Sequence, residues 1–153
     1  MRALECKVPP PVVTAIVAGG MWSFAQVSPS FEVSSGGNKV LALALGLIGF
    51  MIGVAGVVAF RHAHTTVHPM HPEKATALVT SGIYRLSRNP MYLGIVLALI
   101  GWAAYLANVW TLAGPIIFIL YIGRFQIAPE ERALSALFGT TYARYRSAVR
   151  RWL

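Results

Sequence analysis

The chain has 153 residues, of which 56% are hydrophobic and 12% are charged, and its 13 Lys and Arg against 5 Asp and Glu give a net charge of +8. So much apolar surface excludes a disordered chain, and a charged fraction about half the usual one argues against a water-soluble globule. The single cysteine excludes an internal disulfide framework. These numbers indicate a membrane protein of one domain, residues 1–153, whose positive charge belongs beside lipid headgroups and not on nucleic acid.

The apolar residues gather in four long uncharged runs, at residues 12–27, 40–60, 91–107 and 110–123. Because lipid tolerates no open backbone and a crossing helix needs about 20 apolar residues, these runs predict an all-α fold with about four transmembrane helices. Only Asn108 and Val109 separate the last two runs, so Asn108 is predicted to mark the tight turn of a helical hairpin. The first run also fits a cleavable signal peptide, but we favour a transmembrane helix.

The positive charges predict how these helices are oriented. With four crossings, one side of the membrane holds 12 Lys and Arg and the other holds only Lys39. Positive residues accumulate in the cytoplasm, so we expect both ends of the chain and the segment 61–90 to lie inside, in a bacterial inner membrane. An arrangement with three crossings is less asymmetric and stays open.

The second run carries four glycines at helical spacing, namely Gly46, Gly49, Gly53 and Gly56. Small residues at this spacing favour close packing between helices, and a groove for a ligand is the alternative. No glycine-rich turn joins a strand to a helix in the sequence, so we expect no Rossmann or P-loop nucleotide site.

Beyond Pro129 the pattern changes to that of an amphipathic helix. Apolar residues recur at steps of three and four, and arginines fill much of the remaining surface. We expect this helix to begin at Pro129, with Glu130 and Glu131 in its first turn, and to lie at the membrane interface. Gly139 is expected to break it into two pieces.

Two groups of charges lie where apolar helices end. Arg85 and Arg88 precede the third helix, whose first amide groups favour anions, so these arginines suit a carboxylate or phosphate. Anchoring of the helix by positive residues is the alternative. Glu130 and Glu131 follow the fourth helix and suit an ammonium group or a helix cap, and Arg124 is a candidate partner for one of them. A free amino acid headgroup presents both charges.

Several strings in the second half carry a family resemblance. They are LVTSGIY at 78–84, RNPMYLG at 88–94, EERAL at 130–134, FG at 138–139 and YARY at 142–145. In this order, with an apolar hairpin in the middle, they resemble the isoprenylcysteine carboxyl methyltransferases and the related phospholipid methyltransferases. The resemblance implies a membrane enzyme that binds S-adenosyl-L-methionine without a Rossmann domain, in a part of about residues 61–153, and methylates a lipophilic acceptor.

Carried over position by position, the resemblance assigns a set of residues to the cofactor: Thr76, Ala77, Leu78, Val79, Tyr84, Asn89, Pro90, Met91, Tyr92 and Glu130. Glu130 would hold the amino group of the cofactor, with Glu131 a close second. The candidate catalytic residues are Arg88, Arg124 and Glu131. Either arginine would orient an anionic acceptor, and Glu131 would act as the base for an amine acceptor.

Two departures from the family pattern bear on the acceptor. Asn89 stands where relatives that methylate prenylcysteine usually have His, and Gln126 stands where they tend to have Arg. Both departures argue against prenylcysteine but not against methyl transfer. The sequence leaves a carboxylate, a thiol and an amine open as the acceptor, and it leaves the oligomeric state open.

Three other functions are weighed against methyl transfer. Histidines crowd into one polar segment, at His62, His64, His68 and His71, and imidazoles bind zinc, copper or iron. Two prolines and a single nearby carboxylate favour a solvated loop without metal. A membrane reductase that uses NADPH shares parts of the C-terminal pattern, and a scaffold without catalysis is the third alternative.

Overall fold

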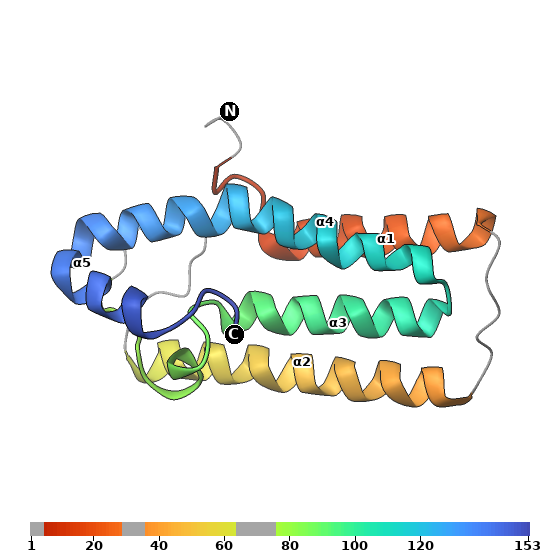
Figure 1. The fold of residues 1–153 in the computed structure, drawn as a ribbon, viewed down its shortest axis with the longest axis horizontal. Coiled ribbons are helices and arrows are strands. Elements are labelled where there is room, and N and C mark those ends of the chain that lie inside the picture. The colour runs from red at the N-terminus through yellow and green to blue at the C-terminus, as the bar shows by residue number, and fades with distance from the viewer. Residues whose placement is uncertain (1–4, 29–35, 64–75) are drawn as a thin grey trace.

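The computed structural model describes residues 5–28, 36–63 and 76–153, and every regular element in these ranges is helical. Four helices lie side by side in an elongated bundle (Figure 1): α1 (Pro10–Val27), α2 (Gly36–His62), α3 (Pro90–Leu106) and α4 (Ala113–Ile122). The remaining elements are the short helices η3 (Gly82–Arg85) and η4 (Val109–Leu112), the π-helical turn η5 (Gly123–Ile127) and α5 (Ala128–Ala148). The predicted all-α fold is confirmed for the described residues.

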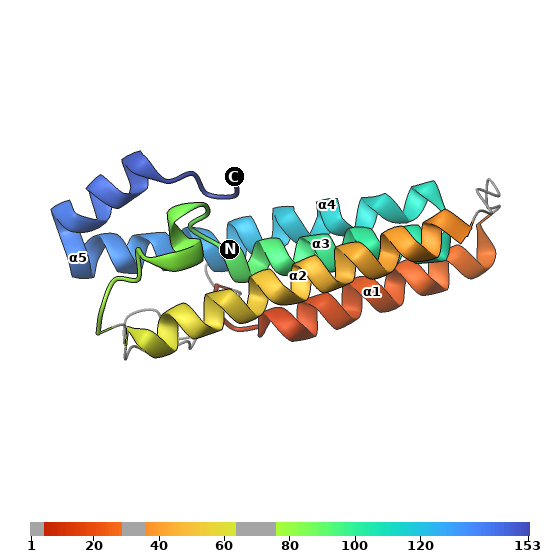
Figure 2. The same ribbon diagram turned by 90° about the horizontal axis from the view of Figure 1, so that it is seen from below.

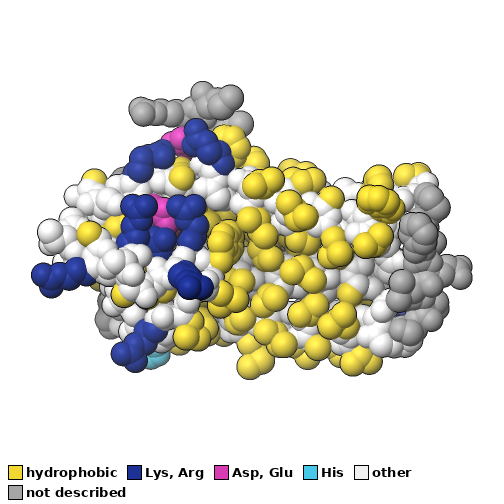
Figure 3. Space-filling model, in the orientation of Figure 1, with side chains coloured by type: hydrophobic (Ala, Val, Ile, Leu, Met, Phe, Trp, Pro, Cys, Tyr) yellow, Lys and Arg dark blue, Asp and Glu magenta, His cyan; other side chains and the backbone are white. Residues whose placement is uncertain are grey.

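The polar segments gather at one end of this bundle. The start of α1, the end of α2, η3 and α5 lie at that end, and the turn between α3 and α4 lies at the other (Figures 1 and 2). Figure 3 shows the same division, with Lys, Arg and acidic side chains at one end and hydrophobic side chains over the rest of the visible face. Lys39 is the exception, because it stands in the first turn of α2 at the far end.

The described helices carry the surface of a membrane protein. Two stretches, α2 and the continuous helix Val109–Ala148, are long and apolar enough to cross a bilayer, and α3 is a shorter apolar helix of 17 residues. Large apolar side chains stand exposed along them, including Leu43, Phe50 and Leu120. Water would not solvate so extensive an apolar surface in a stable monomer, whereas lipid chains would cover it.

Two glycines of α2 bring it against α3. A Cβ atom on Gly49 would overlap the carbonyl oxygen of Gly94, and a Cβ on Gly56 would come within 2.7 Å of a side chain of α3. A Cβ on Gly46 or Gly53 would meet nothing within 4 Å. Close packing is therefore confirmed for two of the four glycines, and the other two face an open groove.

The predicted turn at Asn108 is confirmed. Ala107 adopts a left-handed backbone with φ of 50°, which reverses the chain after α3. The side chain of Asn108 accepts a hydrogen bond from the amide of Trp110 at 3.0 Å, and the Thr111 hydroxyl donates to the Asn108 carbonyl at 2.6 Å. These bonds replace helical hydrogen bonds at the turn, so α4 returns beside α3.

The helix that carries the two glutamates is not a separate helix. It begins at Ala128, one residue before the predicted start, and Glu130 and Glu131 lie in its first turn. However, Ile127 already has helical φ and ψ of −67° and −45°, so α4, η5 and α5 run on without a break. The expected stabilisation of Glu130 and Glu131 by free amide groups at a helix start is therefore absent, because the carbonyl groups of the preceding turn already accept hydrogen bonds from most of these amides.

Pro129 leaves one carbonyl group of this long helix without its helical donor. Proline has no N–H, so the Phe125 carbonyl loses its usual partner four residues later. The amide of Cys6 donates to that carbonyl at 3.0 Å. The segment before α1 is thereby fixed beside η5, at the same end of the bundle as α5.

Gly139 divides α5, as predicted. Its φ of 47° and ψ of −121° are non-helical, and the chain turns back at this residue (Figure 1). The second half of α5 then lies near η3 (Figure 2), with Tyr142 buried. The interfacial position of this helix stays a prediction.

Candidate functional site

The two adjacent glutamates take part in two different clusters. Neighbouring residues of a helix diverge by about 100°, so Glu130 and Glu131 face different partners. The Tyr92 hydroxyl donates a hydrogen bond to the Glu130 carboxylate at 3.5 Å. Glu131 instead forms ion pairs with Arg88 at 2.9 Å and with Arg151 at 2.5 Å.

The first of these, the Glu130 cluster, comprises Glu130, Tyr92, Tyr84 and Gln126. Gln126 hydrogen-bonds to Tyr92, and Tyr84 lies close enough to Glu130 that burial and the carboxylate together raise the pKa of the Tyr84 phenol. Burial raises the pKa of Glu130 to about 7; the Tyr92 hydrogen bond opposes this rise and the charge of Glu131 adds to it. Among the described residues no Lys or Arg pairs with Glu130, so its carboxyl group is available to bind a cationic group of a ligand.

The second, the Glu131 cluster, comprises Glu131, Arg88, Arg151 and Tyr142. The side chains of Arg88 and Glu131 are only 10% and 12% exposed, and Arg88 also donates to the Tyr142 hydroxyl at 3.3 Å. A further donor of Arg88, its Nε, is buried and has no partner within the described residues. A buried donor without a partner is costly, so this atom suits an acceptor group on a ligand.

A backbone clasp at residues 150–151 holds Arg88 in place. The Arg88 amide donates to the Arg150 carbonyl at 3.0 Å, and the Asn89 side chain donates to the Arg151 carbonyl at 2.9 Å. The Tyr145 hydroxyl donates to the Tyr84 carbonyl at 2.7 Å. The clasp joins residues more than 60 positions apart, so the sequence pattern gave no sign of Arg151 or Tyr145 as partners of the site.

Arg124 lies elsewhere. Its side chain is 50% exposed and pairs with Glu5 at 3.2 Å, and Arg132 pairs with the same carboxylate. The expected pairing of Arg124 with Glu130 or Glu131 is therefore wrong. Arg124 joins the segment before α1 to η5, and Glu5, which the sequence did not single out, supplies the carboxylate that Arg124 and Arg132 share.

The other predicted cofactor residues lie in the segment that runs from residue 76 through η3 and at the start of α3. Val79 and Tyr84 are buried against Ala59, near the end of α2. Pro90 is buried at the start of α3, where proline suits the first helical turn. The remaining three form the segment that leads into η3, with Thr76 exposed and Ala77 and Leu78 partly buried.

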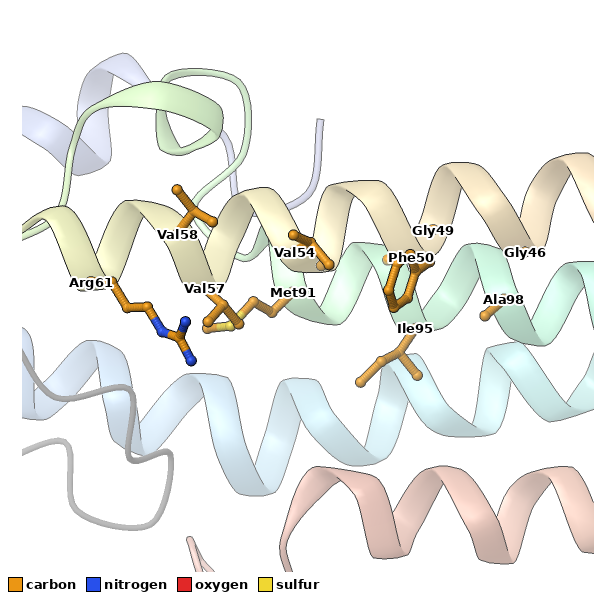
Figure 4. Close-up of a pocket in the computed structure, with 12 residues that line it drawn as sticks. Gly46, Gly49, Phe50, Val54, Val57, Val58, Arg61, Met91, Ile95 and Ala98 are labelled. Carbon is orange, nitrogen blue, oxygen red and sulfur yellow. The ribbon is translucent and has the colours of Figure 1, made fainter.

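Met91 places an apolar groove beside the Glu130 cluster. The groove has a volume of about 710 Å³ and lies between α2 and α3. Its walls are apolar side chains and the open glycines of α2, and Arg61 is the one charged residue among the described residues that line it (Figure 4). Met91 lines it, whereas the next residue, Tyr92, faces Glu130. Two consecutive residues in the first turn of α3 thus face the two regions, Met91 the groove and Tyr92 the Glu130 carboxylate.

The described residues give no support to a metal centre. No group of three His, Cys, Asp or Glu that could hold a metal ion occurs within residues 5–28, 36–63 and 76–153. His62 is exposed at the end of α2, and the other three histidines lie outside these ranges.

Comparison with known proteins supports the resemblance seen in the sequence. The family described as phospholipid methyltransferase matches residues 38–141. A probable protein-S-isoprenylcysteine O-methyltransferase of Oryza sativa subsp. indica is 32% identical over 112 residues, which cover 71% of this chain and 57% of that protein. The protein-S-isoprenylcysteine O-methyltransferase of Schizosaccharomyces pombe is 28% identical over 148 residues, which cover 90% of this chain and 61% of that protein.

A shorter relative matches a smaller part of this chain at higher identity. A Haemophilus influenzae protein, described only as uncharacterized, is 51% identical over 63 residues, which are 41% of this chain and the whole of that protein. The chain spans little more than half the length of the rice and fission yeast methyltransferases. No solved structure matches it.

Proposed function

Because the chain belongs to the phospholipid methyltransferase family, we propose that it is an integral membrane methyltransferase that uses S-adenosyl-L-methionine and methylates a lipophilic acceptor. The observation that carries this proposal is the first turn of α3, where Tyr92 faces Glu130 and Met91 lines the apolar groove. A polar site for the donor and an apolar site for the acceptor would meet within two consecutive residues.

The residues beside this turn suit the amino acid end of S-adenosyl-L-methionine. Glu130 is a partly buried carboxylate without a cationic partner among the described residues, and it would hold the ammonium group. The buried Nε of Arg88 is a donor without an acceptor, and it would bind the ligand's carboxylate. When bound, this cofactor supplies a methyl group that its sulfonium already activates, so the protein's main task is alignment.

The protein's own side chains would hold the reacting groups in place and keep water away. Arg88 is fixed by Glu131, Tyr142 and the backbone clasp, so little freedom is lost when it binds a ligand. Tyr84 is packed against α2 and would form a dry wall of the donor site. Rigid positioning of this kind is what a transfer between two bound molecules requires.

The groove suits the apolar chain of an acceptor. Its open glycines, Gly46 and Gly53, give room for a chain that reaches along α2, and Arg61 stands at the end nearest Met91. A carboxylate or thiolate acceptor needs no strong base, whereas an amine must lose a proton. Glu131 is already paired with two guanidinium groups and is not available to take a proton from an amine, so an anionic acceptor beside Arg61 fits better than an amine.

Asn89 and Gln126, the two departures from the family pattern, both have structural partners. Asn89 holds the Arg151 carbonyl, and Gln126 hydrogen-bonds to Tyr92. Neither is free to play the role of the His or Arg found in relatives that methylate prenylcysteine. We therefore propose the lipophilic acceptor without extending the proposal to prenylcysteine.

We further propose that α1, α2, α3 and α4 each cross the bilayer, with the site in the cytoplasm. In the bundle, consecutive helices run in opposite directions, which returns the site segments to one end (Figure 1). All described Lys and Arg except Lys39 belong to that end, as the tendency of positive loops to stay inside requires.

Lipid extracts incubated with the purified protein and an isotope-labelled methyl donor test this function. The wild-type protein should transfer label into an organic-soluble product, and Glu130→Gln should remove most of that transfer. Arg144→Gln, at an exposed position outside the clusters, is the matched control and should keep it. Failure of the wild-type protein to bind S-adenosylhomocysteine, with NADPH bound instead, would replace methyl transfer by the reductase alternative.

A further inference from the structure

A second apolar pocket lies at the opposite end of the bundle from the candidate site. Its volume is about 390 Å³, and it is lined by residues of α2 and α3: Lys39, Ala42, Leu43, Ala98, Gly101, Trp102 and Tyr105. Ala98 also lines the groove described above, so the two hollows follow one another along the same pair of helices. An apolar trough therefore extends from Lys39 at one end of α2 to Arg61 at the other.

The walls of this second pocket include the aromatic residue types that are enriched at the membrane interface. The rings of Trp102 and Tyr105 stack with centroids 5.3 Å apart and an angle of 9° between their planes. The Trp102 indole donates to the Ala18 carbonyl at 3.1 Å, which fixes this pair against α1. Stacked Trp and Tyr side chains are typical of the level of the lipid headgroups.

Lys39 brings to this pocket a positive charge that no carboxylate of the described residues pairs with. Among the described residues no carboxylate pairs with it, since the described acids all lie at the other end of the bundle. Lys39 also stands in the first turn of α2, where the helix dipole disfavours a cation. An anion beside Lys39 would relieve both effects, and the adjoining pocket offers space for an apolar chain.

We propose that this pocket binds an anionic phospholipid of the leaflet opposite the candidate site, with its phosphate on Lys39 and one acyl chain between α2 and α3. The lengths agree with this occupant. At 1.5 Å per residue, Gly46 lies about 10 Å and Gly53 about 21 Å along α2 from Lys39. A chain that fills one leaflet reaches about 15 Å, half of the hydrocarbon core, and so ends between these two glycines.

This lipid would close the far end of the groove that faces the site. Its chain would end beyond Gly46, which lines the larger hollow together with Ala98. A second copy of this chain is the competing occupant, since glycines on a lipid-facing helix also favour helix pairing. The charge of Lys39, which has no carboxylate partner within residues 5–28, 36–63 and 76–153, favours the lipid, because a second copy would bring a second Lys39 and no acid of these segments to that end. The inference does not depend on methyl transfer.

Native mass spectrometry of the full chain tests this inference. The protein is released from micelles that contain phosphatidylglycerol and phosphatidylcholine with identical acyl chains in equal amounts. The wild-type protein should retain one phosphatidylglycerol per chain, in about fivefold excess over phosphatidylcholine, the scale of one Lys near an anionic surface. Lys39→Gln should abolish this excess, and Arg144→Gln, at an exposed position outside the trough, should keep it.

A third variant separates the chain from the headgroup. Ala98 is exposed to the trough, and Ala98→Leu should lower the retention of both lipids by narrowing the space for the acyl chain. Equal retention of the two lipids by the wild-type protein, or an unchanged excess in Lys39→Gln, would overturn the inference. A lipid-free dimer that Ala98→Leu dissociates would show that a second copy occupies the trough.

Discussion

Cofactor affinity should depend on pH through Glu130. Burial raises the pKa of this carboxyl to about 7, and an ammonium group held against it would lower that pKa when the ligand binds. The ligand then binds the ionised form, so affinity is full above this pKa and falls about tenfold for each pH unit below it. In the lower range, binding therefore releases a proton from the protein.

The size of the effect follows from the ionised fraction of Glu130. For a pKa of about 7, the Kd for S-adenosylhomocysteine at about pH 5.5 should be about 25 times its value at about pH 7.5. Calorimetry in two buffers of different ionisation enthalpy should show close to one proton released per ligand at about pH 6. Glu130→Gln should weaken binding and flatten this profile.

Tyr92→Phe provides a finer test of the same reasoning. The Tyr92 hydroxyl donates to Glu130 and lowers its pKa, so its removal should move the midpoint of the profile to higher pH. Arg144→Gln is the control at an exposed position and should keep the wild-type profile. A Kd that stays constant across this range, or an equal slope in Glu130→Gln, would refute the assignment of Glu130 as the ammonium anchor.

The remaining predictions concern stability. Because the pKa of Glu130 is raised, the folded protein holds this proton more tightly than the unfolded chain does. The ligand-free protein should therefore lose stability as the pH rises from about 4.5 to about 7. Thermal unfolding of the wild type and of Glu130→Gln should show this loss in the wild type alone. Glu131→Ala leaves the buried Arg88 guanidinium without its carboxylate and should lower the free energy of unfolding by about 3–5 kcal/mol. Arg151→Ala removes a more exposed partner and should lower it by about 1 kcal/mol. Equal losses for the two variants in a denaturant titration would contradict the Glu131 cluster. Gly49→Ala should cost about 1–3 kcal/mol because its Cβ overlaps backbone of α3, while Gly53→Ala should be neutral or stabilising, and thermal unfolding in one detergent compares the two.

The elements that the sequence predicted well are those set by local pattern. Long uncharged runs favour helices in lipid, because a helix pairs its own backbone groups, and Asn108 between two of them marks a turn because its side chain can replace helical hydrogen bonds. Gly139 was identified as a break on similar grounds, since glycine alone adopts its φ of 47° without strain. Glu130 and Arg88 were singled out by their place at the ends of apolar helices.

The partners of those residues were not predictable in the same way. Arg124 was paired with the nearest acids in sequence, but Glu5, more than 100 positions away, holds it instead. The clasp from Asn89 to the Arg151 carbonyl also joins distant parts of the chain. Such contacts depend on where the helices place each segment, and one sequence carries no record of that placement. The different roles of Gly49 and Gly53 likewise depend on which face of α2 meets α3.

The π-helical turn η5 sets the rotation of α5, which carries the two glutamates, relative to α4. Over one turn of η5, a π-helix rotates the chain less than an α-helix of the same residues does, and the difference is nearly the rotation of one α-helical residue. Were residues 123–127 rewound as α-helix, everything after them would swing by about 100°, and Glu130 would point where Glu131 now meets the arginines. The pitch of the backbone one turn earlier, and not either side chain, thus decides which of the two neighbouring glutamates meets the guanidinium groups of the described residues.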